Sequence, residues 1–138
     1  MTKQEIVTKF KECFERDGIV WVIGNGGSSA EASHLSEEFI SLGFPVIALN
    51  DPAVITALVN DFDPREVFQR YVKAVAKKGD LLVTLSTSGR SVNVIWAQGQ
   101  ANSAGVEILE WPRNKGGTTE EIQNEQLQLI HEVYIAFK

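Results

Sequence analysis

The chain has 138 residues and a formal net charge of −5, from 13 basic and 18 acidic side chains. A hydrophobic fraction of 43% is typical of one globular domain with its own hydrophobic core. The acidic balance excludes nucleic acid and anionic membrane as main partners, and the apolar stretches are too short to span a bilayer. The single cysteine, Cys13, excludes an internal disulfide and, with no signal-like segment near Met1, predicts a cytoplasmic protein.

Apolar periodicity and turn residues predict helices and strands that alternate along the chain. In order, these are a helix over 3–16, a strand over 19–23, a helix over 30–41, a strand over 45–49, helices over 52–59 and 65–76, a strand over 80–85, a helix over 92–103, a strand over 106–111 and a last helix from Thr118 to Lys138. This alternation predicts an α/β domain over 1–138, with a doubly wound, mostly parallel sheet of about four strands between two helical layers. Such a three-layer sandwich is flavodoxin-like.

Two loops rich in Ser and Gly follow the first and third predicted strands. They read GNGGSS over 24–29 and STSGRS over 86–91. Because the carboxyl ends of parallel strands meet at one edge of a sheet, both loops and the following helix N-termini are expected to lie together. Backbone N–H groups, hydroxyls and the helix dipole suit a phosphate there.

Other interpretations of these loops stay open. Each is also compatible with a plain turn whose serine caps the next helix. The first loop matches two glycines of G-x-G-x-x-G, but Ser29 stands at the third, which makes a nicotinamide-dependent oxidoreductase a weaker alternative. Arg90 either adds charge to the phosphate site or is simply solvated.

The residues GNGGSSAEASHLSEEF, FPVIALN, VNDF, VFQRYVKAVAKKGDLLVTLSTSGRSVNVI and IQNEQLQLIH together resemble the sugar-isomerase (SIS) domain family. Within that family they are most similar to the branch that isomerises sedoheptulose 7-phosphate in heptose biosynthesis. The resemblance implies an aldose–ketose isomerase that forms a homo-oligomer, dimer or tetramer, with active sites built across subunit boundaries. A phosphosugar-binding SIS module without catalysis, regulatory or dependent on a partner chain, is the alternative.

The resemblance also assigns roles to individual residues. It places phosphate and substrate on Asn25, Gly26, Gly27, Ser28, Asp61, Ser86, Thr87, Ser88, Ser91 and Gln123, with Asn25 and Asp61 facing the sugar. It makes Glu38 and His131 the acid/base pair. In some relatives a zinc ion is held by residues that match His34, Glu38, Gln123 and His131.

Helical spacing is compatible with these roles. His34 and Glu38 are four residues apart and share a helix face, and Gln123 and His131 are separated by about two turns. Without the resemblance, Glu38 reads as a solvated helix residue and His131 as a half-buried histidine.

Three segments depart from the family pattern. One helix precedes Val20 where the family has a further N-terminal helix, the arginine-containing insertion after Glu38 is missing, and the stretch between Trp111 and Thr118 is short. We hypothesise that Arg90 takes the place of the missing arginine.

Overall fold

The computed structural model describes every residue from Met1 to Lys138. Its elements, in chain order, are α1 (Lys3–Glu15), β1 (Val20–Gly24), α2 (Gly27–Ser41), β2 (Val46–Ala48), α3 (Pro52–Asp61), a short 3₁₀ turn η1 (Pro64–Glu66), α4 (Val67–Val75), β3 (Leu81–Leu85), α5 (Val92–Ser103), β4 (Glu107–Glu110) and α6 (Thr119–Ile135). All predicted helices and strands are present. No helix is both long enough and apolar enough to cross a membrane.

The four strands form one sheet in the order β2-β1-β3-β4, and every neighbouring pair is parallel. The predicted doubly wound α/β fold is confirmed. The winding direction reverses between β1 and β3, and a parallel sheet opens a ligand crevice at such a point. Gly24 at the end of β1 pairs with Leu85 at the end of β3, so the two Ser/Gly-rich loops leave the sheet side by side.

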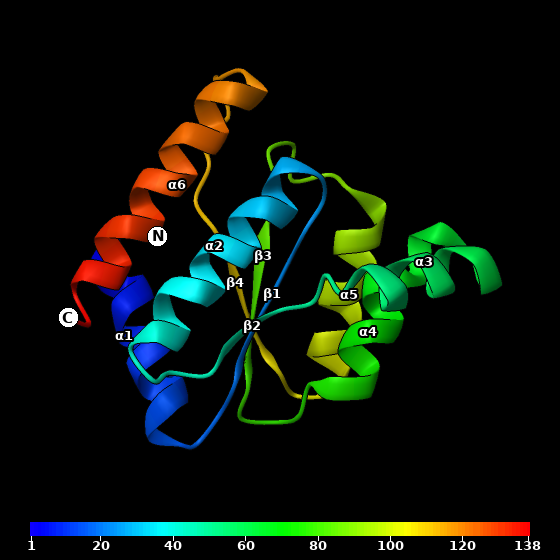
Figure 1. The fold of residues 1–138 in the computed structure, drawn as a ribbon, viewed down its shortest axis with the longest axis horizontal. Coiled ribbons are helices and arrows are strands. Elements are labelled where there is room, and N and C mark those ends of the chain that lie inside the picture. The colour runs from blue at the N-terminus through cyan, green and yellow to red at the C-terminus, as the bar shows by residue number, and fades with distance from the viewer.

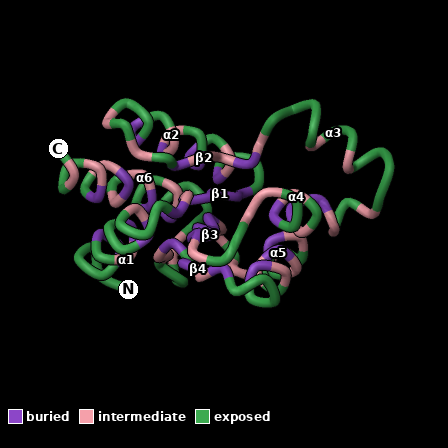
Figure 2. Tube along the Cα trace, turned by 90° about the horizontal axis from the view of Figure 1, so that it is seen from below, coloured by how far each residue is buried: buried purple, intermediate pink, exposed green.

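Helices cover both faces of the sheet, as Figure 1 shows. Val20 and Val22 of β1 pack into a core with α1, α2 and α6, whereas Trp21 and Ile23 face α4 and α5. This period of two is what a strand buried on both faces requires. The buried strands form the centre of the tube in Figure 2. Helix α3 has no buried residue and projects beyond these layers.

Helix α2 begins earlier than its sequence predicts. It starts at Gly27 rather than Ala30, so Ser28 and Ser29 belong to its first turn and not to a loop. Gly26 is the N-cap residue and has a φ of 54°, a left-handed conformation that favours glycine. Because Ala30 and Ser29 donate to the Gly26 carbonyl at 3.1 and 3.0 Å, the helical hydrogen bonds begin directly after this glycine.

Helix α6 and the two edge strands of the sheet are shorter than predicted. The Thr118 hydroxyl accepts the backbone N–H of Glu121 at 3.2 Å, which confirms the predicted cap, but the helix ends at Ile135 and not at Lys138. Strand β4 covers four residues and β2 only three. Both are edge strands, with ladder hydrogen bonds on one side only, so their ends are less tightly defined than those of β1 and β3.

Candidate active site

A small cavity lies where β1 and β3 end. Its volume is about 180 Å³, and polar side chains dominate its wall. The lining residues are Asn25, Ser28, Leu85, Ser86, Thr87, Ser91, Thr119 and Gln123. The structure therefore brings together six residues that the sequence analysis named for substrate, and adds Thr119 from the start of α6. We call this cavity the cradle.

Two of the helices that begin at the cradle, α2 and α5, lack side-chain caps. Neither Gly26 before α2 nor Ser91 before α5 makes a side-chain hydrogen bond to the helix N-terminus, whereas α1, α3 and α6 each have such a cap. Uncapped N–H groups carry the positive end of the helix dipole toward the cavity. Ser91 occupies the N-cap position of α5 without a side-chain hydrogen bond to it, and the arrangement suits an anion.

Two asparagines join the first loop to α5. Asn25 Nδ2 donates to Asn93 Oδ1 at 3.0 Å, and Asn93 Nδ2 donates back to Asn25 Oδ1 at 2.9 Å. This reciprocal pair fixes the orientation of the Asn25 side chain, which lines the cradle. Asn93 was missed in the sequence because only the β1–β3 pairing brings it next to Asn25.

Helix α6 closes the cradle on a third side. An ideal Cβ at Gly27 would lie 2.5 Å from Nε2 of Gln123, so the glycine leaves the space that the Gln123 amide occupies. The buried Gln126 donates through Nε2 to the carbonyl of Ser86 at 3.3 Å, which ties α6 to the second loop. A glycine at position 27 thus allows the Gln123 side chain of α6 to approach the backbone of α2 closely.

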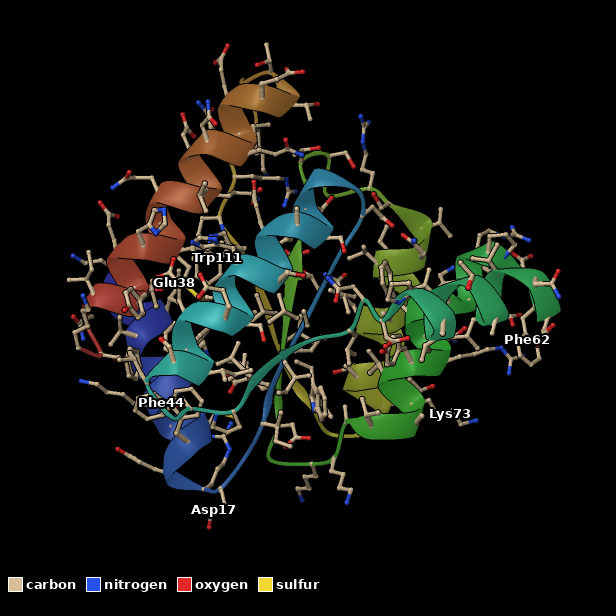
Figure 3. The ribbon with its side chains drawn as sticks, viewed as in Figure 1. Asp17, Glu38, Phe44, Phe62, Lys73 and Trp111 are labelled. Carbon is tan, nitrogen blue, oxygen red and sulfur yellow. The ribbon has the colours of Figure 1, made fainter.

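A second group of polar side chains lies between α2 and α6. Oε1 of Glu38 is 2.5 Å from Nε2 of His34 and 2.8 Å from Nδ1 of His131. The two imidazole rings are nearly perpendicular, with centroids 5.1 Å apart. Glu38 is 7% exposed, and its second oxygen, Oε2, is buried without a hydrogen-bond partner. Figure 3 shows Glu38 between the two helices.

This cluster combines a carboxylate with two imidazoles that remain partly open to solvent. One ligand atom from each of His34, Glu38 and His131 lies within 4.8 Å of the others, which is close enough for one metal ion. A carboxylate and an imidazole can also exchange protons near neutral pH. The interpretation of Glu38 as a solvated helix residue is wrong.

Glu31 is a further acidic group on the same stripe of α2, three residues before His34. It is buried, its Oε2 has no hydrogen-bond partner, and burial raises its pKa from 4.5 to about 7. Its spacing from His34 and Glu38 places Glu31 on their face of the helix, but the sequence did not predict that its carboxyl group would be buried there.

Besides Gly27, three residues that the resemblance assigns to substrate do not line the cradle. Gly26 lines a cavity on the far side of the first loop, and Ser88 lines the neighbouring cavity together with Arg90. Asp61 is exposed at the end of α3, next to Phe62, which Figure 3 shows far from Glu38. The structure does not bring Asp61 to the cradle of its own chain.

Known proteins are similar to this chain in sequence and in fold. A sequence model described as the SIS domain matches residues 4–109. Phosphoheptose isomerase from Glaesserella parasuis is 37% identical over 134 residues, covering 93% of this chain and 70% of that protein. Its namesake from Sodalis glossinidius is 40% identical over 112 residues, covering 77% and 58%. The structure of phosphoheptose isomerase from Neisseria gonorrhoeae matches with a TM-score of 0.92 at 29% identity, covering 98% of this chain and 84% of that one.

The parallel sheet with two Ser-rich loops at its switch point is the architecture of the SIS domain class. Within that class the chain belongs to the phosphoheptose isomerase family. It spans 58 to 70% of the length of the two relatives compared by sequence.

Proposed function

We propose that the chain is an aldose–ketose isomerase that converts sedoheptulose 7-phosphate to an aldose heptose 7-phosphate. The observation that carries this proposal is the contact of the Glu38 carboxylate with both His34 and His131 between α2 and α6. The names of the related proteins support the substrate. The cradle supplies the phosphate end of the site, and the cluster supplies the reactive end.

The substrate would run from the cradle along α2 toward Glu38. Ser28 in the first turn of α2 and His34 are six residues apart, or about 9 Å of helix rise. An open-chain sugar phosphate with its phosphate on Ser28, Ser86, Thr87 and Ser91 would extend past Gln123 and present its carbonyl end to Glu38.

Isomerisation moves one proton between adjacent carbons through an enediol. Glu38 would take the proton from C1 of the ketose while the C2 carbonyl oxygen gains a proton from His131. In the second half, the C1 hydroxyl loses its proton to His131 and Glu38 returns a proton to C2, which leaves an aldehyde at C1. Each acid/base group contributes about a hundredfold or more to the rate.

The same cluster fits a zinc ion. The buried, unpartnered Oε2 of Glu38 and the two histidine nitrogens form a donor set of the kind zinc prefers. His34, Glu38 and His131 would hold the ion, with Gln123 as the additional ligand that family resemblance implies. When bound, zinc would polarise the substrate carbonyl.

The proposal includes a homo-oligomer in the cytoplasm. Helix α3 is apolar yet has no buried residue, and Val59 and Phe62 remain 44% and 43% exposed, so a second copy of the chain would cover it. In such an assembly Asp61 would reach the cradle of a neighbouring subunit. A cytoplasmic location is compatible with a single cysteine that is buried and unpaired.

The direct test is product formation by the purified protein from pentose, hexose and heptose phosphates, with and without a zinc chelator. The proposal expects turnover of sedoheptulose 7-phosphate above all others and its loss with the chelator. Binding of sugar phosphates by calorimetry with no turnover of any would contradict the isomerase and establish the non-catalytic module instead.

A further inference from the structure

A second cavity, of about 430 Å³, adjoins the cradle on the outer side of the loop after β3. It is lined by Thr87, Ser88, Arg90, Arg113, Lys115, Gly117, Thr119 and Ile122. Thr87 and Thr119 also line the cradle, so the two cavities share a wall. We call this second cavity the basic cavity.

The three cations of the basic cavity have no carboxylate partners. The other arginines of the chain, Arg16, Arg65 and Arg70, each form an ion pair within 3.4 Å, but Arg90 and Arg113 form none. The carboxylates of the nearby first turn of α6, Glu120 and Glu121, do not line the cavity. In a chain with a net charge of −5, this is a local concentration of uncompensated positive charge.

The loop after β3 determines where one of these cations, Arg113, lies. Gly89 has a φ of 69°, and an ideal Cβ built on it would overlap the guanidinium of Arg113. The glycine therefore lets Arg113 lie directly against the loop whose other side forms the cradle. Arg113 is half-buried, which limits the freedom of its side chain and presents its donors in a fixed direction.

We propose that the basic cavity binds a second phosphoryl group of a ligand whose first phosphoryl group occupies the cradle, so that the chain recognises diphosphates. The inference rests on the proposed role of the cradle in holding phosphate. A guanidinium offers paired donors that match phosphoryl oxygens, and Lys115 adds a point charge. The shared residues Thr87 and Thr119 place the two anionic groups next to each other, as in a pyrophosphate or a diphosphate ester.

The test is calorimetric titration with orthophosphate and with pyrophosphate at fixed ionic strength. The wild type is expected to bind pyrophosphate at least tenfold more tightly than orthophosphate. The double variant Arg113→Gln/Lys115→Gln should reduce this preference to within twofold, while its orthophosphate affinity stays within twofold of wild type. Lys73→Gln, on α4 and in the lining of neither cavity, is the control for a general loss of positive charge and should keep the full preference.

Equal affinities for the two anions in the wild type would overturn the inference, and so would a double variant that weakens both by the same factor. Orthophosphate binding together with isomerase activity, but without a preference for pyrophosphate, would refute the basic cavity and leave the proposed function standing. Binding of neither anion would refute the cradle as well. A variant Arg113→Lys, which keeps charge but loses the paired donors, should retain only part of the preference.

Discussion

Nδ1 of His131 lies 2.8 Å from Oε1 of Glu38, although 93 residues separate the two in the chain. Their contact depends on α2 and α6 packing side by side on one face of the sheet, with buried Leu35 and Ile130 in the core beneath. The same packing places Gly27, near the start of α2, against the Gln123 side chain of α6. One helix pair thus positions both the Gln123 side of the cradle and the cluster of His34, Glu38 and His131.

Metal binding at the cluster predicts a stability change. A saturating zinc salt should raise the midpoint of thermal unfolding of the chelator-treated protein by several degrees, because a ligand at a hundred times its Kd adds about 2.7 kcal/mol to the folded state. His34→Gln and His131→Gln should each remove most of this increase. Magnesium, which prefers oxygen ligands, is the matched control. An equal increase in both variants would place the metal elsewhere.

The contact of Gly27 with Gln123 predicts an effect on ligand binding more than on folding. A methyl group in Gly27→Ala must displace the flexible Gln123 amide, so phosphate affinity should fall about threefold or more while thermal stability changes little. Gly99→Ala, also in a helix and with open space around its Cβ, is the control and should increase stability by up to about 1 kcal/mol.

A second substitution checks the cause. In the background of Gln123→Ala, the change at Gly27 should have no further effect on affinity, since the group that it displaces is gone. Additive losses in the double variant would show that Gly27 acts through its own backbone and not through Gln123.

The raised pKa of the buried Glu31 leads us to predict that the stability of the fold depends on pH. Burial raises its pKa from 4.5 to about 7, so between these values the folded chain holds a proton that the unfolded chain has lost. The contribution of Glu31 to stability is therefore largest below pH 4.5 and declines as the pH rises toward 7. Glu31→Gln should raise the midpoint of thermal unfolding relative to the wild type, and this increase should be about 3 °C larger at pH 8 than at pH 5. The difference corresponds to about 1 kcal/mol in the free energy of unfolding, after allowance for solvent screening.

Thermal unfolding at both pH values measures this gain, with the exposed Glu12→Gln as control. A gain that is the same at pH 5 and pH 8 would show that Glu31 is ionised normally in the folded protein.

Local signals predicted the fold well, because continuous apolar runs such as Ile19–Ile23 and capping residues such as Thr118 act over a few positions. The start of α2 was misplaced because glycines are poor helix formers, and only the bonds to the Gly26 carbonyl show that Gly27 is helical. The lengths of the edge strands β2 and β4 were overestimated, because each of these strands has a hydrogen-bonded neighbour on one side only.

The site was predicted in part. The two Ser-rich loops were recognisable from the residues themselves, whereas the roles of Glu38 and His131 came from family resemblance. Asn93 and Thr119 were missed because their neighbours come from distant elements, and Glu31 was missed because its burial arises only in the folded chain. The position of Asp61 on a projecting helix was likewise not visible in the sequence.

The central claim is that Glu38 transfers the proton between carbons of a sugar phosphate that is anchored in the cradle. The most direct measurement is the steady-state rate of Glu38→Gln with sedoheptulose 7-phosphate, beside the exposed control Glu132→Gln. We predict that kcat of Glu38→Gln falls at least a hundredfold while KM stays within about threefold, and that the control matches the wild type. A kcat for Glu38→Gln within about threefold of the wild type would contradict this account.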